Sequence, residues 1–480
     1  MILKLILTVS IFFYFELNAQ NIDSQTLNKI DNYIKNTQNK ANIPIISIGI
    51  VKNHNLIYKN SYSKNANINT KSLFYIGSLT KSFTALAIMQ LVEDRKINLD
   101  DSINKYLPWF KIKDEKKINN ITIRTLLNQT SGFSTYDGLK NFDDWDSSDF
   151  ALEKTIRALK DISLVSEPSS TFHYSNINYQ ILGLVIEKVS GLSYSLYIKE
   201  NIFHKLDMNN SFVSLDKINK KDMVQGHRLW FGQAIKSDFP FSKVMLPAGY
   251  IISNVEDMGN YLIAQLNNGN YKNKQIFSSS IINQMQTPSA TIQKDKSYYG
   301  FGWFIDTREE LYLSHLGVTP GYTSAMIIYP KEKLGLIVLT NATSYTLGNK
   351  ELTNLAGGII DIIKNKEPKS NEIDIISISA YIFFIGLMII QLYFLYRLIK
   401  KFKTISIYKV LISIVLDVLI MILLFFIVPK LYDLTFSGFL MFVPDIGYLM
   451  LSSIIISFFG LIGKSIVLMK IYNKSLERNI

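Results

Sequence analysis

The sequence predicts an α+β body with an antiparallel sheet, followed by an α-helical membrane region. Runs rich in β-branched residues lie near both ends of the body, with helical patterns between them. Three long apolar segments follow residue 374. A chain of 480 residues has room for one large extramembrane domain and these segments.

The strands and helices of the body can be placed from these patterns. Residues 43–51 and 56–58 predict a strand pair joined by an asparagine-rich turn, and residues 324–330 and 333–341 predict a second pair. Apolar residues recur at helical spacing between Lys81 and Asp94, and a closing helix is expected at Leu352–Lys364. The body therefore has strands at both ends and helices in the middle.

The first residues predict a secretory signal. One lysine precedes an apolar run from Leu5 to Phe15, and small and polar residues follow. We expect a signal peptide at 1–19 with cleavage after Ala19. The alternative is an uncleaved anchor, because Leu17 suits the third position before the cleavage site less well than alanine does. The cleaved signal places the body, residues 20–366, outside the cytoplasm.

The C-terminal region, residues 375–480, follows a polar linker at 367–374 and predicts three transmembrane helices. Each apolar segment approaches the roughly 20 residues that cross a bilayer. A further apolar piece at Phe436–Val443 is too short to cross, and we expect it at the interface. The three expected spans are 375–399, 410–428 and 448–471.

The charges flanking these spans predict their orientation. The first connecting loop and the C-terminal tail are rich in lysine and arginine, and the second loop is not. Basic loops stay in the cytoplasm, so the body lies outside and the C-terminus inside. Asp417 and Lys464 fall within spans, where we expect them to pair between helices or to reach the headgroups rather than to serve transport or signalling.

The composition limits the chemistry. The net charge of +12 suits a membrane face or a polyanionic cell wall, although a solvated lysine-rich surface with basic membrane flanks is the better explanation. No basic run is interleaved with aromatic residues, so no nucleic-acid partner is expected. The chain has no cysteine, and its five histidines are scattered without ligand spacing. We therefore expect neither a metal nor a cofactor.

Ser78 and Lys81 form an S-x-x-K pair within F-Y-I-G-S-L-T-K-S-F. The spacing alone is weak evidence, because four other serine–lysine pairs share it, beginning at Ser61, Ser102, Ser214 and Ser406. Ser78 differs because it begins a predicted helix, so Lys81 stands one turn later on the same face. A neutral lysine can take the proton of a serine hydroxyl, and the helix N-terminus can stabilise an oxyanion. These features make Ser78 a candidate nucleophile.

Two further stretches carry candidate site residues. Tyr174-Ser175-Asn176 precedes an amphipathic helix, where a phenol could move a proton and an amide could hold a carbonyl; alternatively Asn176 caps the helix and Tyr174 is a packing residue. His315-Leu316-Gly317 leads toward a strand, where the glycine would let a substrate lie against the strand edge. Taken alone, it could equally be an ordinary turn.

The order of these stretches carries a resemblance. Between G-S-L-T-K and H-L-G-V-T-P-G-Y come L-L-N-Q-T-S-G, Y-S-N-I-N-Y, P-A-G-Y-I-I-S and Y-G-F-G-W. Over residues 43–341 the chain resembles the class C β-lactamase-like family of serine penicillin-recognising proteins, which includes D,D-carboxypeptidases, D-aminopeptidases and esterases. The resemblance implies a β-lactamase/transpeptidase-like fold, a helical region beside the antiparallel sheet, and a serine hydrolase.

The resemblance also implies roles for individual residues. Ser78 would be acylated, Lys81 would be its base, and Tyr174 would activate the acceptor for deacylation. Asn176 would orient the substrate amide. The third motif would contain His315 and Gly317, and the backbone N–H groups of Ser78 and Val318 would form the oxyanion hole.

The third motif departs from the family pattern, which is usually Lys-Thr-Gly. His315 and Leu316 replace a permanent cation and a hydroxyl that bind a substrate carboxylate. We therefore expect D-amino-acid esters or peptides of the cell envelope as substrates, rather than efficient β-lactam destruction. Apart from this substrate and membrane lipid, no partner is predicted. The alternative function is a non-catalytic penicillin-binding sensor or scaffold coupled to the membrane helices; a transporter is poorly supported.

Overall fold

A computed structural model describes residues 22–64, 67–216, 218–219, 221–369, 374–401 and 406–476. The expected signal peptide at 1–19 lies outside these ranges. The chain divides into two compact units, a body formed by most residues up to 371 and a C-terminal unit formed chiefly by later residues. Each unit is described separately.

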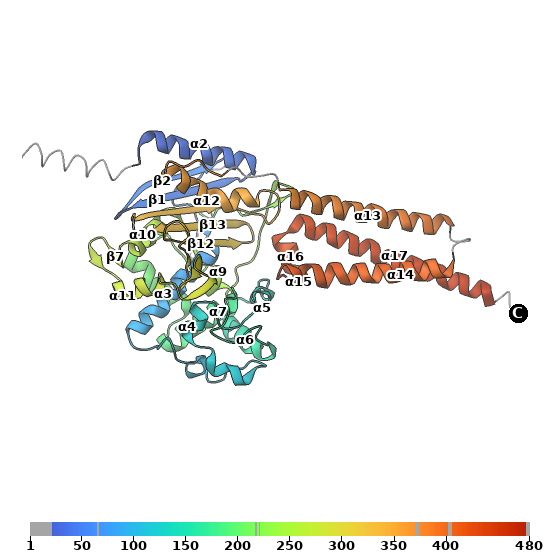
Figure 1. Cartoon of the computed structure of the whole chain (residues 1–480), viewed down its shortest axis with the longest axis horizontal. Helices are drawn as coiled ribbons and strands as arrows, with labels where there is room; N and C mark the ends of the chain where they lie inside the picture. Colours follow the sequence, from blue (N-terminus) through green and yellow to red (C-terminus); the bar gives the residue numbers. More distant parts are fainter. Residues whose placement is uncertain are drawn as a thin grey trace, which may run out of the picture. The chain divides into compact units, whose positions relative to one another are not determined.

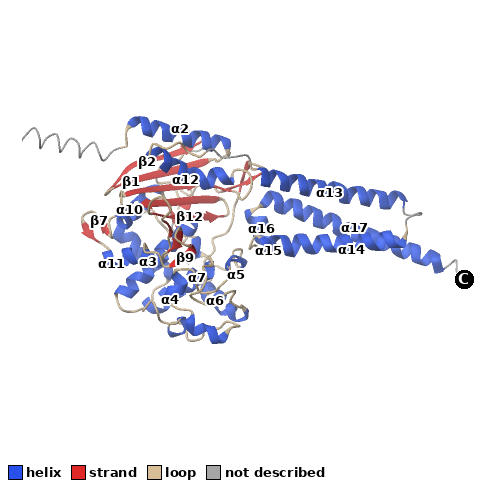
Figure 2. Ribbon diagram, viewed as in Figure 1, coloured by secondary structure: helices blue, strands red, loops and turns tan. Residues whose placement is uncertain are grey.

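An eight-stranded antiparallel sheet is the centre of the body (Figure 2). Strands from the two ends of the body are neighbours in this sheet, because β1 pairs with β14. In spatial order the strands are β2 (Asn55–Ser63), β1 (Ile45–Lys52), β14 (Leu334–Thr340), β13 (Tyr322–Tyr329), β12 (Tyr312–Thr319), β11 (Phe304–Asp306), β10 (Ser297–Tyr299) and β9 (Ala290–Gln293). The expected α+β class with an antiparallel sheet is confirmed.

Helices cover both faces of the sheet. Helices α2 (Ser24–Lys40) and α12 (Asn349–Ile363) pack together on one face, and α10 (Val255–Leu266) packs against β1, β2 and β14 (Figure 1). Every residue of β14 and nearly every residue of β1 is buried. Double coverage explains why these strands are continuous apolar runs rather than alternating ones.

A helical region continues the body beyond the sheet (Figure 1). Its central element is α3 (Thr80–Glu93), which matches the expected helix within a residue at each end. We expected one apolar stripe, but residues 80–89 are all buried, including four polar side chains. Their polar groups make hydrogen bonds inside the body; Thr84 Oγ1, for example, donates to Pro247 O at 2.7 Å. The other helices of this region are α4 (Ile123–Leu127), α5 (Thr135–Lys140), α6 (Ala151–Arg157), α7 (Asn176–Ser190), α8 (Tyr194–Ile198), α9 (Leu246–Gly249) and α11 (Ser279–Met285).

The C-terminal unit contains three helices that are long and apolar enough to cross a membrane. They span Ile375–Lys400, Ile407–Leu431 and Pro444–Asn473. The second comprises α14 (Ile407–Ile422), a π-helical segment at Leu423–Ile427 and α15 (Val428–Leu431). The first and third correspond to α13 (Ile375–Lys401) and α17 (Pro444–Leu476), and the short piece before α17 is the helix α16 (Phe436–Phe442).

Buried polar side chains join these helices. Lys464 Nζ of α17 donates to Asp417 Oδ2 of α14 at 2.6 Å, and both side chains are less than a tenth exposed. Gln391 of α13 donates to Ser457 Oγ at 2.8 Å and accepts from Ser453 Oγ at 2.7 Å. The expected pairing of Asp417 and Lys464 between helices is thus seen. Such contacts fix helix register where apolar packing alone is unspecific.

Candidate active site

Two glycines bring the nucleophile segment against the sheet. Ser78 lies in a 3₁₀ turn, Gly77–Leu79, that leads into α3. Gly77 has a φ of +53°, and a Cβ there would be 2.4 Å from the backbone nitrogen of Val318. A Cβ at Gly317 would be 2.1 Å from Ile76 O. We expected Gly317 to make room for substrate, but the structure gives a packing reason: the glycine lets β12 approach the nucleophile turn.

Lys81 is completely buried beside Ser78. Its Nζ lies 3.1 Å from Ser78 Oγ, 2.8 Å from Asn176 Oδ1 and 2.7 Å from Ala248 O. Burial lowers the pKa of Lys81 well below its ordinary value of 10.5, which favours the neutral amine. A neutral amine has two N–H groups and one lone pair, and the two carbonyl oxygens can only accept. The lone pair therefore remains for the Ser78 hydroxyl, which is the arrangement of a general base and its nucleophile.

Asn176 contacts the lysine instead of capping its helix. It is the first residue of α7, whose N-cap is Ser175, so the alternative interpretation of Asn176 as the cap is wrong. Its Oδ1 accepts from Lys81, while its Nδ2 has no hydrogen bond to any residue that the structure describes. The amide can therefore hold Lys81 and still donate to a substrate carbonyl.

Tyr174 lies over Lys81 within an aromatic cluster. The Lys81 Nζ is 4.8 Å from the centroid of the Tyr174 ring. The ring stacks on Phe304, with centroids 6.1 Å apart, and meets Tyr299 edge-on at 6.4 Å. This packing orients the ring, and the ring face favours Lys81 when the amine gains a proton. Sequence alone left packing and catalysis as alternatives for Tyr174, and these ring contacts show the packing.

His315 lies within β12 rather than in a turn. The imidazole is 2 % exposed; Nδ1 is 2.7 Å from Leu316 O and Nε2 is 3.2 Å from the Tyr299 hydroxyl. A carbonyl can only accept, so Nδ1 carries the proton and Nε2 accepts from Tyr299. Burial, and then the nearby Lys81, lower the pKa of His315 to about 3. The third motif therefore presents a neutral imidazole.

Three further groups complete the site, and no role in it was predicted for them from the sequence. Gln129 is fully buried, and its Oε1 accepts from the backbone N–H of Ser175 at 3.0 Å. The other two are the Ala248 carbonyl and the Tyr299 hydroxyl described above. All three belong to stretches that carried the family resemblance, which was the signal available. Gln129 positions the loop that carries Tyr174 and Asn176.

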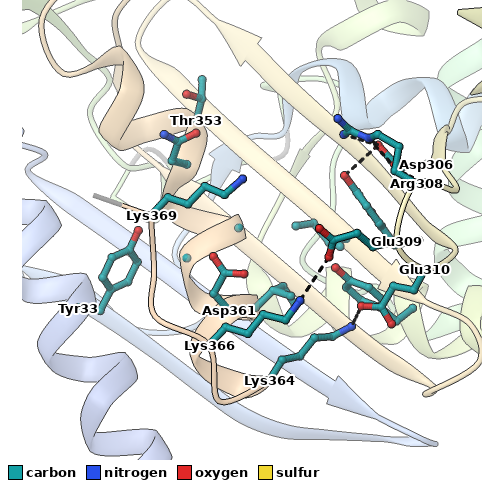
Figure 3. Close-up of a pocket in the computed structure, with 17 residues that line it drawn as sticks. Tyr33, Asp306, Arg308, Glu309, Glu310, Thr353, Asp361, Lys364, Lys366 and Lys369 are labelled. Atoms are coloured by element: carbon teal, nitrogen blue, oxygen red, sulfur yellow. Dashed lines mark hydrogen bonds and ion pairs between the residues drawn. The ribbon is translucent and has the colours of Figure 1, made fainter. Parts of the chain in front are cut away.

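A strongly charged hollow in the body contains none of the site residues predicted from the sequence. It has a volume of about 430 Å³ and lies among α2, α12 and strands β11–β13 (Figure 3). Its charges are largely paired: Arg308 with Asp306, Lys366 with Glu309, and Lys364 with Glu310. No group of three metal-binding side chains was found anywhere in the described ranges.

Comparison with known proteins agrees with this geometry. The family model named Beta-lactamase matches residues 30–356. The chain belongs to the beta-lactamase family. We expected a likeness to the staphylococcal FmtA-like protein Flp, and Protein flp of Staphylococcus aureus (strain COL) is 31 % identical over 328 residues, which cover 67 % of this chain and 64 % of flp. The chain thus spans somewhat less than two thirds of that relative.

Two other proteins extend the comparison. Penicillin-binding protein 4* of Bacillus subtilis (strain 168) is 29 % identical over 286 residues, covering 57 % of this chain and 62 % of that protein. The structure of the octameric penicillin-binding protein homologue from Pyrococcus abyssi has a TM-score of 0.61 and 27 % identity, covering 71 % of this chain and 78 % of that one. The expected β-lactamase/transpeptidase-like fold is confirmed.

Proposed function

We propose that the protein is a membrane-anchored serine hydrolase that acts outside the cell on D-amino-acid esters or peptides of the envelope. The observation that carries this proposal is the environment of Lys81. A fully buried amine with two carbonyl acceptors and a serine hydroxyl at 3.1 Å is arranged to take the serine proton. Membership of the beta-lactamase family supports a serine hydrolase.

The reaction proceeds through an acyl-enzyme. Ser78 Oγ gives its proton to Lys81 and bonds to the substrate carbonyl carbon, while the N–H groups of Ser78 and Val318 hold the resulting oxyanion. The bond to the leaving group then breaks, and the proton passes to that group by way of Tyr174. Water then attacks the acyl carbon and gives a proton to Tyr174; the bond between Ser78 Oγ and the acyl carbon breaks, the acid is released, and the proton from Tyr174 restores the Ser78 hydroxyl. Asn176 holds the substrate amide during both steps.

The third motif selects against substrates with a carboxylate beside the scissile bond. His315 is neutral and engaged with Tyr299 and Leu316 O, and the Leu316 side chain, 44 % exposed, offers no hydrogen bond. A charge-assisted pair with a terminal carboxylate is therefore unavailable from this motif. Neutral leaving groups, such as the alcohol of a D-aminoacyl ester, do not need an ion pair with the third motif.

The C-terminal helices support the membrane anchor. Three helices have the length and hydropathy of spans, and their side chains facing away from the bundle are apolar, such as Ile376 and Phe426. The basic first loop and tail favour a cytoplasmic C-terminus. In this arrangement the body is extracytoplasmic and the helices contact membrane lipid.

Hydrolysis of two matched esters by the full-length protein in a nonionic detergent tests the proposal. The substrates are N-acetyl-D-alanyl-D-lactate, which carries a carboxylate, and its methyl ester, which does not. We expect kcat/KM for D-alanyl bond cleavage to be about tenfold higher for the methyl ester. Ser78→Ala should abolish both reactions.

Two outcomes contradict this function. Faster cleavage of the carboxylate-bearing substrate would overturn the role given to the third motif. A stable Ser78 acyl adduct with no turnover of either ester would favour the alternative, a penicillin-binding sensor or scaffold coupled to the membrane helices.

A further inference from the structure

A second hollow adjoins the oxyanion hole. It has a volume of about 260 Å³, and its walls come from segments that also build the site. Tyr75 precedes Ser78 by three residues, Thr319 directly follows Val318, and Tyr250 follows Gly249, where a Cβ would lie 3.9 Å from the backbone nitrogen of Ser78. The hollow therefore flanks the carbonyl position of a substrate bound at Ser78.

Aromatic rings form much of its wall. Tyr75 meets Tyr250 edge-on at 5.4 Å between centroids and Tyr322 edge-on at 5.3 Å. Phe239 also lines the hollow. Aromatic faces attract cations, and several rings around one space are the usual way in which proteins bind alkylammonium groups.

One carboxylate completes the wall. Asp238 carries the only formal charge among the described residues that line the hollow. Gln225 Nε2 donates to its Oδ1 at 2.8 Å, and its Oδ2 has no partner in the described part of the chain. Burial first, and then the nearby Tyr75 and Asp238, raise the pKa of Tyr322, so the carboxylate lies close to that ring. An aromatic wall with a single carboxylate is suited to a positive charge and not to an anion.

Two buried hydroxyls in the same wall lack hydrogen bonds. The hydroxyl oxygens of Tyr250 and Thr319 have no partner among the described residues, and both side chains are 2 % exposed. Burial of an unpaired hydroxyl is unfavourable. The described protein groups therefore leave two polar atoms of this wall unsatisfied.

The hollow lies toward the acyl part of a substrate. Lys81 and Tyr174 handle the proton of the leaving group, so the leaving group lies on their side of the reacting carbon. None of the residues that line the hollow is hydrogen-bonded to Lys81 or in ring contact with His315 within the described ranges. The acyl group of the substrate then extends from the oxyanion hole in the other direction, toward the hollow.

We propose that this hollow is a subsite for an aliphatic ammonium group on the acyl part of the substrate, and that Asp238 determines this specificity. The inference rests on the proposed function, because it presupposes an acyl-enzyme at Ser78. It narrows the substrates to esters or peptides whose acyl group carries a free amine. The subsite holds this group by the Asp238 carboxylate and the tyrosine rings.

Labelling rates with matched fluorophosphonates test the subsite. The probes are ω-aminoalkyl fluorophosphonates with chains of about two to six carbons and alkyl analogues of equal length, applied to the full chain in a nonionic detergent at pH 7 and low salt. Each transfers its phosphonyl group to Ser78 Oγ, with fluoride leaving and the serine proton passing to Lys81. The measurement is the second-order rate constant of adduct formation from intact mass.

We expect the amino probe to react about tenfold faster than its alkyl analogue at the best chain length. Asp238→Asn should remove most of this preference by slowing the amino probe, with the alkyl analogue measured on the same variant as the reference. Asp295→Asn is the matched control, because Asp295 is exposed in a turn between β9 and β10, and it should keep the preference.

Two outcomes overturn the proposal, and they differ. If Asp238→Asn keeps the wild-type ratio of amino to alkyl rates at every chain length, the subsite is wrong while the Ser78 nucleophile stands. If neither probe labels Ser78 in folded protein, the proposed function fails and the subsite with it.

Discussion

The neutral imidazole of His315 predicts a specific loss of stability in acid. An unfolded chain binds a proton on this side chain below its ordinary pKa of 6.5, whereas burial keeps the folded imidazole neutral down to about pH 3. Between these values the unfolded state binds more protons, so the free energy of unfolding falls as the pH falls and is flat above 6.5. Between these two pKa values, each pH unit changes the free energy of unfolding by about 1.4 kcal/mol. The loss should be about 3 kcal/mol at pH 4 and should approach about 5 kcal/mol below pH 3.

The substitution that isolates this effect is His315→Gln, which replaces the titrating imidazole by an amide that does not titrate. The free energy of unfolding is measured by urea denaturation of the full chain in detergent, with tryptophan fluorescence as the signal, since Trp303 is fully buried. All other titrating groups are common to both proteins and cancel in the difference. Wild type should lose about 3 kcal/mol more than His315→Gln between pH 7 and pH 4.

Parallel pH dependences of the two proteins would refute the reasoning. Such a result would mean that His315 can accept a proton in the folded state. A protonated His315 could then pair with a substrate carboxylate, and the third motif would no longer favour neutral leaving groups.

Three other predictions follow from the site and the membrane helices. Lys81→Arg replaces the neutral amine by a permanent cation that cannot act as a base, so fluorophosphonate labelling of Ser78 should slow by at least about 100-fold, with circular dichroism confirming the fold. Gly77→Ala places a Cβ 2.4 Å from Val318 N and should slow labelling by about 100-fold by displacing the oxyanion hole, whereas unchanged labelling would contradict that geometry. Lys464→Met leaves the Asp417 carboxylate buried and unpaired, and should lower thermal stability in detergent. The double variant Asp417→Asn/Lys464→Met should recover most of that loss, and equal losses in both would argue against the pair.

Local patterns predicted the elements of the fold well. The apolar runs of β1 and β14 and the helical spacing of α3 required no tertiary information. The burial of α3 on every side could not be read from its sequence, because its polar residues find partners in distant segments. Thr84, for example, is hydrogen-bonded to Pro247. Periodicity records which residues are apolar and does not record which polar residues are satisfied internally.

The site was predicted as a set of residues and not as a geometry. The S-x-x-K spacing placed Lys81 beside Ser78, but its burial depends on acceptors 95 and 167 positions away, Asn176 and Ala248. The order of the stretches pointed to the family, and hence to the roles of Tyr174 and the third motif. The neutral state of His315 follows from its burial and the nearby Lys81, which lower the pKa of the imidazole and which only the folded arrangement supplies.

The most direct test of the central claim is the intact mass of the full-length protein after exposure to a fluorophosphonate and, separately, to penicillin. We expect one fluorophosphonate adduct on the wild type and none on Ser78→Ala, whatever the outcome with penicillin. A folded wild type that gains no adduct from either reagent, or an equal adduct on Ser78→Ala, would contradict the assignment of Ser78 as the nucleophile.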